Sequence, residues 1–180
     1  MQRFGFTARD GKKVVFREPK KTDAKLLLEF INAFVDEPRS GLLINKKGTL
    51  KEERAWLKST LESIKSRKEV MLVVEHDGKL VGNCSLNRQT WKSSHVADLG
   101  IAIGKEMRGK GIGEALIKRT IELAKKRMRG LELVTLKTFE YNKRAQELYK
   151  KVGFFEVGRI PMGNKEGDEY FDDLVMVMRL

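Results

Sequence analysis

Apolar residues recur along the first third of the chain at intervals of three and four, which is typical of helices that bury one face. One such run lies between Thr22 and Pro38. A second follows Thr49, which with Glu52 three residues later forms a capping box for a helix expected over 50–66. The apolar positions of the first run are Leu26, Leu27, Phe30, Ile31 and Phe34. We therefore expect two amphipathic helices, joined by a polar loop.

Strands are expected where apolar and β-branched residues run together or alternate over four to eight positions. Residues 14–18 read VVFRE, and residues 70–86 read VMLVVEHDGKLVGNCSL. Within the second stretch the pair Asp77-Gly78 separates two apolar runs, which is a strong signal for a hairpin. Residues 95–103 are expected to form a further strand.

The second half of the chain alternates between the two patterns. The expected elements are a helix over 112–128, a strand over 131–139, a helix over 142–152, a strand over 154–157 and a strand over 171–178. Hairpin strands followed by strand-helix-strand units indicate an α/β domain with a mixed sheet. No linker or repeat divides the chain, so we expect a single domain over 1–180.

The composition narrows the class of protein. Of the 180 residues, 41% are hydrophobic and 34% are charged, which is too much core for a disordered chain and too much charge for a membrane protein. No apolar run approaches the ~18 residues that span a bilayer. A lone cysteine, Cys84, excludes an internal disulfide, and His76 and His95 lack metal-ligand spacing. We expect a cytoplasmic protein that contacts no membrane and binds no metal.

The formal net charge of +12 is distributed unevenly. Residues 104–151 hold 14 basic and 6 acidic side chains, whereas residues 152–180 hold 3 and 6. A protein that binds nucleic acid over its whole surface would not normally turn acidic at one end, so nucleic acid is not an expected partner. Most of the lysines are expected to lie on solvated helix faces, and a compact anion could bind within 104–151.

The stretch DLGIAIGKEMRGKGIGEALI, residues 98–117, is suited to bind such an anion. An apolar strand runs into a glycine-rich turn and then directly into a helix. The first amides of a helix lack intrahelical partners, the helix dipole adds positive potential, and glycine has no Cβ to hold a ligand away. Arg108 and Lys110 add side-chain charge there. We expect a phosphate or pyrophosphate to bind at this turn.

Two nucleotide-binding classes fit this turn poorly. Gly104, Gly109 and Lys110 match the GxxxxGK part of a P-loop. However, Gly111 stands where a P-loop has the hydroxyl residue that binds magnesium. A dinucleotide-binding GxGxxG is also absent, because the next glycine is Gly113 and no acidic residue ends a strand ~20 positions later. The remaining pattern is Arg-x-x-Gly-x-Gly.

With Arg108, Gly111 and Gly113 in that pattern, the sequence closely resembles the GNAT family of acetyl-CoA-dependent N-acetyltransferases. A second signature agrees, since NKRAQELYKKVGF, residues 142–154, is similar to the family's Asn-x-x-Ala-x-x-x-Tyr-x-x-x-Gly-Phe helix. The ending GDEYFDDLVMVMRL is similar to the last strand of members that acetylate protein amines. The resemblance implies a mixed, mostly antiparallel sheet with flanking helices.

The resemblance also implies roles for individual residues. In the family, the strand before the glycine turn splays from the next one and pairs with the pantetheine arm of acetyl-CoA. Asn142 matches a residue that contacts the pantetheine region, and Tyr149 matches the tyrosine beside the thioester sulfur. A phenol has a reference pKa of ~10 and can give a proton to a departing thiolate; the alternative for Tyr149 is a packed aromatic. The other cofactor-binding residues implied are Ile101, Ala102, Ile103, Arg108, Gly109, Lys110, Gly111, Ile112 and Gly113.

The reaction needs a route for a proton as well. An amine attacks a thioester only when neutral, yet a lysine with a pKa of ~10.4 is almost wholly protonated at pH 7. Asp98 begins the central strand, where some histone-acetylating members carry a glutamate base, and is the candidate base; the alternatives are an ordered water as base and a structural role for Asp98. An acidic group near the last connection is expected to attract a protonated acceptor. Its members are Glu166, Asp168, Glu169, Asp172 and Asp173.

The function expected from the resemblance is direct transfer of the acetyl group of acetyl-CoA to a primary amine. A protein N-terminus is the first choice of acceptor, a lysine or polyamine the second, and a small drug-like amine the third, so a protein or peptide is the expected partner. An acyl-enzyme on Cys84 is disfavoured because that thiol is expected to be buried. The alternative function is a non-catalytic module that senses CoA or binds nucleic acid, and Tyr149 and Asn142 weigh against it.

Overall fold

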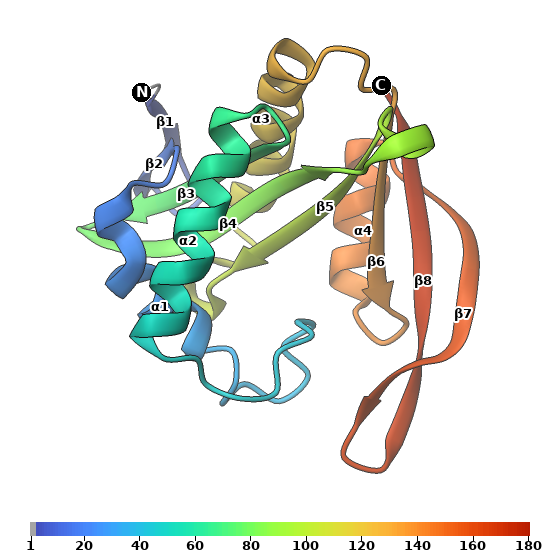
Figure 1. Cartoon of the computed structure of the whole chain (residues 1–180). Helices are drawn as coiled ribbons and strands as arrows, with labels where there is room; N and C mark the ends of the chain where they lie inside the picture. Colours follow the sequence, from blue (N-terminus) through green and yellow to red (C-terminus); the bar gives the residue numbers. More distant parts are fainter. Residues whose placement is uncertain (1–2) are drawn as a thin grey trace.

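An eight-stranded sheet organises residues 3–180, the part of the chain that this computed structural model describes (Figure 1). The strands follow the order β1-β2-β3-β4-β5-β6-β8-β7, and every neighbouring pair is antiparallel except β5 and β6. The strands are β1 (Arg3–Thr7), β2 (Lys13–Arg17), β3 (Glu69–His76), β4 (Lys79–Arg88), β5 (Val96–Ile103), β6 (Leu133–Phe139), β7 (Phe155–Glu166) and β8 (Glu169–Arg179).

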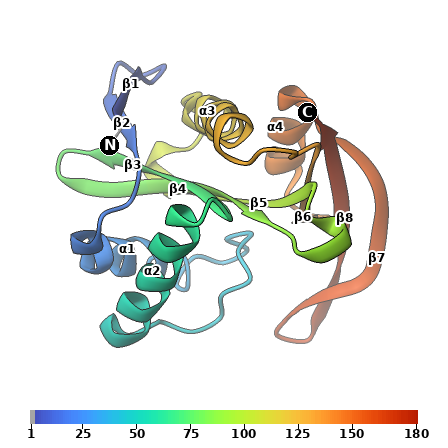
Figure 2. The ribbon, with the colours of Figure 1, turned by 45° about the horizontal axis from the view of Figure 1, so that its top comes forward.

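Two helices cover each face of the sheet (Figure 2). One face carries α1 (Ala24–Asn32) and α2 (Leu50–Lys65), and the other carries α3 (Ile112–Arg127) and α4 (Lys143–Val152). Each helix pair buries its own apolar core against the sheet. The expected class, a mixed and mostly antiparallel α/β fold, is confirmed. None of the helices in residues 3–180 is long and apolar enough to cross a membrane.

Local signals in the sequence explain several element boundaries. The capping box forms at α2, where the Thr49 hydroxyl accepts from the Glu52 amide at 3.3 Å and the Glu52 carboxylate accepts from the Thr49 amide at 2.8 Å. The β3–β4 hairpin turns at Asp77 and Gly78, both with positive φ, as a tight two-residue turn requires. Gly153, with φ of 112°, ends α4.

Two strands differ from the expectation. β1 was not expected, because its five residues RFGFT are too short and too exposed to show a clear pattern. β7 was expected to end at residue 157 and extends to Glu166, since it pairs along β8 as the outer strand. Most of β7 is exposed, so it has no alternating apolar pattern, and its edge position tolerates Pro161.

The parallel pair β5 and β6 is joined over only three register positions. Val96, Ala97 and Asp98 face Leu133, Val134 and Thr135, and beyond these residues the strands separate. β5 stays paired with β4 and β6 with β8 along the rest of their lengths. The sheet therefore opens at its centre, and each of the two strands keeps one free edge there. In Figure 1 this opening faces the bottom of the view.

Candidate active site

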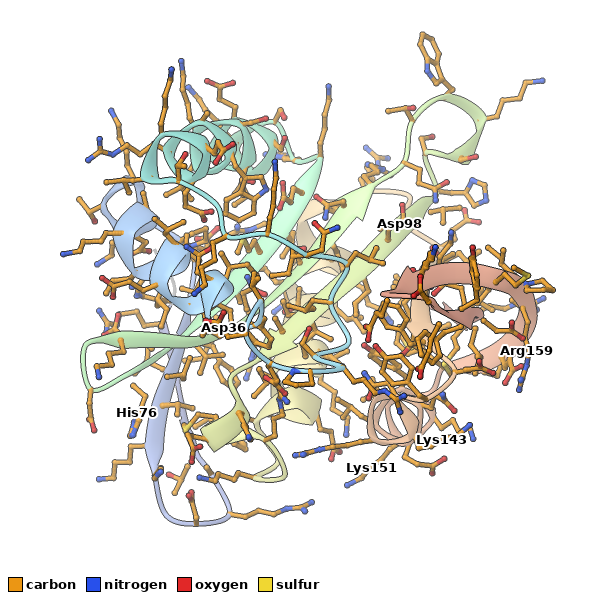
Figure 3. The ribbon with its side chains drawn as sticks, turned by 90° about the horizontal axis from the view of Figure 1, so that it is seen from below. Asp36, His76, Asp98, Lys143, Lys151 and Arg159 are labelled. Atoms are coloured by element: carbon orange, nitrogen blue, oxygen red, sulfur yellow. The ribbon has the colours of Figure 1, made fainter. Side chains whose placement is uncertain are left out.

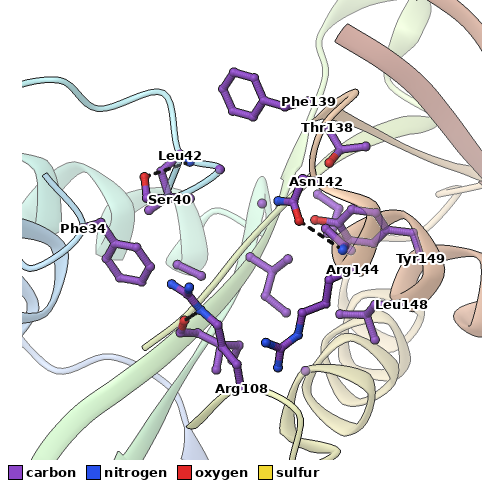
Figure 4. Close-up of a pocket in the computed structure, with 18 of the residues that line it drawn as sticks. Phe34, Ser40, Leu42, Arg108, Thr138, Phe139, Asn142, Arg144, Leu148 and Tyr149 are labelled. Atoms are coloured by element: carbon purple, nitrogen blue, oxygen red, sulfur yellow. Dashed lines mark hydrogen bonds between the residues drawn. The ribbon is translucent and has the colours of Figure 1, made fainter. Parts of the chain in front are cut away.

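A cavity of about 610 Å³ occupies the opening between β5 and β6 (Figure 4). Residues 99–103 of β5 form one wall, and residues 137–139 of β6 with one side of α4 form the other. The loop between α1 and α2 contributes Phe34 and residues 39–43, and the glycine turn closes one end. The predicted Ile101, Ala102 and Ile103 therefore line the cavity along the free edge of β5.

The glycine turn has the geometry of an anion site. Gly109 and Gly111 have φ of 77° and 84°, a region that glycine occupies without strain. Gly111 is the N-cap of α3 and makes no side-chain cap, and the amides of Gly109, Lys110 and Gly111 donate to no backbone group within residues 3–180. Consecutive free amides at the start of a 16-residue helix attract a phosphate.

The side chains of Arg108 and Lys110 hold the turn in place. The Arg108 guanidinium donates to the Ile103 carbonyl at 2.8 Å and forms a two-pronged ion pair with Glu37, while Lys110 pairs with Asp10 at 2.7 Å. Both charges are thus largely neutralised within the protein. Lys110 and Ile112 do not line the cavity, so any part they play in binding comes from their backbone amides.

Two other arginines bring positive charge to the turn. Arg9, from the β1–β2 connection, places its Nε 3.6 Å from where a Cβ on Gly111 would lie. Arg144, in the first turn of α4, places a guanidinium nitrogen 3.1 Å from the equivalent point at Gly109. Both line the cavity. Arg144 could have been suggested by its place two residues after Asn142, whereas nothing in the sequence indicated Arg9.

Asn142 and Tyr149 both reach the cavity from α4. Asn142 is the N-cap of that helix, and its side-chain oxygen accepts from the Ala145 amide at 3.2 Å. Its other side-chain atom, Nδ2, lies so close to the α1–α2 loop that a Cβ on Gly41 would be 2.5 Å away. Asn142 therefore fixes the start of α4 and meets the loop across the opening.

Tyr149 is 8% exposed and directs its hydroxyl into the cavity (Figure 4). Burial raises the pKa of this phenol above its ordinary value, and the neighbouring Cys84 adds to the shift. The phenol is therefore protonated at neutral pH. Cys84 itself is fully buried, and burial raises the pKa of its thiol to about 12. An uncharged, buried thiol is a poor nucleophile.

Asp98 lies where β5 and β6 are still paired, one residue before the cavity wall begins. Its carboxylate accepts from Gln89 at 3.0 and 3.1 Å and from the Thr135 hydroxyl at 2.5 Å. Figure 3 shows Asp98 over the central strands, apart from α4 with Lys143 and Lys151. The structure thus holds Asp98 next to the cavity rather than in it, with polar partners instead of a lysine.

A polar row crosses the sheet through Asp98 on the face covered by α1 and α2. The register places Glu69 opposite Asn87, Asn87 opposite Asp98 and Asp98 opposite Thr135. Glu69 is buried, and burial alone raises the pKa of its carboxyl to about 7. Sequence reasoning missed this residue, because a glutamate that begins an apolar strand looks like an exposed strand end.

Most members of the acidic group expected near the acceptor already have hydrogen-bond or ion-pair partners within the protein, at the β7–β8 end of the cavity. Glu166 accepts from the Tyr141 hydroxyl at 2.7 Å, and Glu169 pairs with Arg39 at 3.0 Å. Asp172 accepts from a backbone amide in β7, and Asp168 is exposed at the turn. Asp173 is different, since it is only 8% exposed and lines the cavity.

No group of three or more His, Cys, Asp or Glu in residues 3–180 is arranged to hold a metal ion. The groups that line the cavity include a phenol, two carboxylates, several guanidinium groups, the free edge of β5 and the start of α3.

Comparison with known proteins places this site in a family. The model of the acetyltransferase (GNAT) family matches residues 29–154, which include both sides of the cavity. The chain belongs to this family. The solved acetyltransferase of the GNAT family from Streptococcus pneumoniae superposes with a TM-score of 0.83 at 26% identity, covering 93% of this chain and 99% of that one. A putative acetyltransferase from Salmonella typhimurium, solved with its cofactor acetyl-CoA, superposes with a TM-score of 0.79 at 18% identity, covering 93% and 94%.

Two curated relatives are named for different acceptors. The L-amino acid N-acetyltransferase AaaT of Escherichia coli (strain K12) is 32% identical over 106 residues, 58% of this chain and 65% of that protein. A putative [ribosomal protein bS18]-alanine N-acetyltransferase of Bacillus subtilis (strain 168) is 37% identical over 83 residues, 46% of this chain and 51% of that protein. The chain thus matches less than two thirds of the length of either relative.

The raised pKa of Glu69 predicts a pH-dependent cost to stability. Between pH 4.5 and 7 the folded protein holds a proton on Glu69 that the unfolded chain has lost, so the free energy of unfolding falls as the pH rises through this window. The change in the free energy of unfolding caused by Glu69→Gln should therefore be more favourable at pH 8 than at pH 4.5, by about 2 kcal/mol. Urea unfolding at the two pH values measures this difference. Glu62→Gln, on an exposed position of α2, is the control, and an equal pH dependence for both variants would contradict the prediction.

Proposed function

We propose that this protein transfers the acetyl group of acetyl-CoA to a primary amine. The observation that carries the proposal is the continuous path from the free amides of the glycine turn, along the open edge of β5, to the Tyr149 hydroxyl. An elongated cofactor with a phosphate end and a thioester end matches this path. The family to which the chain belongs supports acetyl-CoA as the donor.

The cofactor would lie with its pyrophosphate at residues 108–113 and its pantetheine arm along β5. Arg9 and Arg144 flank the turn and would supply positive charge to the phosphates. The charges of Arg108 and Lys110 are already paired with Glu37 and Asp10. The amide groups of the arm would pair with the free edge at Ile101 to Ile103, because β6 leaves that edge unpaired. Asn142 would contact the arm from the other wall.

Acetyl transfer then needs one bond to form and one to break. The neutral amine attacks the thioester carbon, a C–N bond forms, and the C–S bond breaks to release a thiolate. Tyr149 would supply the proton that the sulfur takes up. Burial raises the pKa of this phenol, so it stays protonated and available as a donor until the thiolate forms beside it. Partial burial would also raise the pKa of the leaving thiol, which favours transfer of the proton to sulfur.

The acceptor amine would approach from the face covered by α1 and α2. Asp173 would attract a protonated amine, because the other carboxylate that lines the cavity, Glu114, is already paired with Lys118 and Lys151. Asp98, one residue outside the cavity wall, would take the proton through a water molecule and pass it to solvent. We propose a protein N-terminus as the first acceptor and a free amino acid as the second, because one curated relative is named for each. Incubation with acetyl-CoA, a peptide library and an amino-acid panel, with detection of free CoA thiol, tests the proposal. No thiol release above the hydrolysis rate would reject it.

Gly111→Asp should abolish acetyl-CoA binding. The substitution places a Cβ in a conformation that only glycine adopts freely, and it puts a negative charge where the pyrophosphate should lie. Calorimetry with acetyl-CoA should show at least a ~100-fold weaker affinity in the folded variant. Gly78→Asp is the matched control, because Gly78 has a similar φ of 75° but lies in the β3–β4 turn. Equal affinities for the two variants would contradict the assignment.

Tyr149→Phe should lower kcat by ~10² and leave the affinity for acetyl-CoA near that of the wild type, because the lost proton donor acts on the transition state. Steady-state kinetics with calorimetry separate the two effects. Tyr170→Phe is the control and should keep full activity, because the Tyr170 side chain is half-exposed in β8 and does not line the cavity. An unaltered turnover number in Tyr149→Phe would assign this residue to packing alone.

Asp173→Asn and Asp98→Asn should affect different kinetic constants. Loss of Asp173 should raise KM for a cationic acceptor about tenfold and make it less sensitive to salt, since an attractive charge is removed. Loss of Asp98 should instead remove or shift the acidic limb of the kcat/KM profile against pH. Asp168→Asn, at the exposed turn, is the control for both. Profiles and KM values identical to those of Asp168→Asn would exclude both carboxylates from the mechanism.

A further inference from the structure

A second cavity, of about 620 Å³, lies at the opposite end of the central strands from the active site. It forms where α2 ends, where α3 ends and where β4 leads into β5, and these segments gather at the top of Figure 1. Ten residues line it; five are basic and none is acidic. The basic residues are Arg67, Lys68, Arg88, Arg127 and Arg129.

Three of these cations are available to a ligand. Arg127 forms a two-pronged ion pair with Glu18, and Arg88 donates to the carbonyls of Ser94 and Arg129. Within residues 3–180, by contrast, the side chains of Arg67, Lys68 and Arg129 form no ion pair. Unpaired positive charges that line one pocket repel one another. A bound anion would lower this repulsion and is therefore attracted.

An exposed aromatic residue, Trp91, is among the residues that line the same cavity. Trp91 is 91% exposed and has φ of 58°, a backbone conformation that is strained for a residue other than glycine. The segment that carries it is nevertheless fixed, because Ser94 N donates to the Trp91 carbonyl at 3.1 Å and Gln89 N donates to the Val96 carbonyl at 2.9 Å. The loop therefore presents a flat apolar surface to solvent, and it does so from a residue that lines the cavity together with the free cations.

We propose that this cavity binds single-stranded RNA. Guanidinium groups match phosphate oxygens in geometry as well as charge, and an exposed indole is a stacking platform for an unpaired base. An acidic peptide would use the charge but not the indole, and a duplex has no unstacked base to offer. Gln89 binds Asp98 through its Nε2, which leaves its side-chain oxygen free to accept from a ribose 2′-hydroxyl.

The proposed site is separate from the acetyl-CoA cleft. The 16 residues of α3 run between them, from the glycine turn at its start to Arg127 at its end, a length of about 24 Å. RNA in this pocket would therefore leave the cofactor path open. The uneven charge along the chain argued against nucleic acid. That count follows the order of the sequence, whereas this pocket collects cations from three segments that are far apart in the sequence.

Fluorescence anisotropy with a labelled eight-nucleotide uridine RNA tests the proposal, with saturating acetyl-CoA present throughout. We expect micromolar binding at low salt. Trp91→Ala should weaken it roughly tenfold or more through loss of stacking, and Arg67→Gln with Arg129→Gln should reduce the salt slope by about 1.4. Trp56→Ala, on the outer side of α2, is the matched control and should bind as the wild type does.

Three results would overturn the proposal. The first is RNA binding that is unchanged in Trp91→Ala and in the double arginine variant. The second is that a control ligand binds as well as the RNA does. If an oligo-glutamate of the same charge competes equally with the RNA, an acidic peptide is the ligand. If an eight-nucleotide thymidine DNA binds as tightly as the RNA, the 2′-hydroxyl has no role. The third is RNA binding that is markedly tighter in a parallel titration without acetyl-CoA, which would place the RNA in the active-site cleft. All three variants change exposed side chains, so circular dichroism should show native folding.

Discussion

The separation of β5 from β6 after three paired residues is the constraint on which the active site depends. In an intact sheet the backbone groups of both strands would satisfy each other and leave no room between them. Here each strand keeps its outer partner, β4 or β8, so the sheet stays continuous while its centre opens. The free edge of β5 leads directly into the glycine turn, because η3 (Lys105–Met107) and the turn follow β5 in sequence. One break in pairing thus creates the cavity and aligns the proposed anion site with Tyr149, the proposed proton donor.

The basic side chains of the glycine turn are not free to attract an anion, because acidic residues from elsewhere in the chain neutralise them. Arg108 and Lys110 are engaged by Glu37 and Asp10, which belong to the α1–α2 loop and the β1–β2 connection. These pairs hold two distant segments against the turn and so shape it. We infer that the attraction for phosphate depends on the backbone amides of the turn and on Arg9 and Arg144, which line the cavity. The motif's charged side chains would then position the turn, while its amides and these two arginines would supply the positive potential.

Much of the fold and part of the site could be predicted from the sequence. Short-range signals were sufficient for α2, for the β3–β4 turn and for the helix starts at Gly111 and Asn142, because caps and turns involve residues only a few positions apart. Arg9 and Glu69 were different, and Asp173 was named only as one member of an acidic group. Arg9 reaches the site because β1 pairs with β2, Glu69 is buried although it begins a strand, and Asp173 meets the cavity through its register opposite Phe139. Such contacts depend on pairing between distant segments, which local patterns do not encode.

The two ends of α3 illustrate opposite solutions to the binding of an anion. At its N-terminus the helix dipole and free amides are favourable, so glycines suffice and the nearby cations can serve structure. At its C-terminus the dipole is unfavourable to an anion, because the last carbonyls point outward. Some basic residues there, such as Arg127, are explained by that dipole and by the ion pair with Glu18. Arg67 and Lys68 follow α2 and Arg129 follows α3, yet all three line one cavity with Trp91. Compensation of the helix dipoles would place cations at each helix end separately. It does not explain why cations from two helices line one cavity with an exposed indole. Binding of a ligand that carries both phosphates and aromatic bases explains this arrangement.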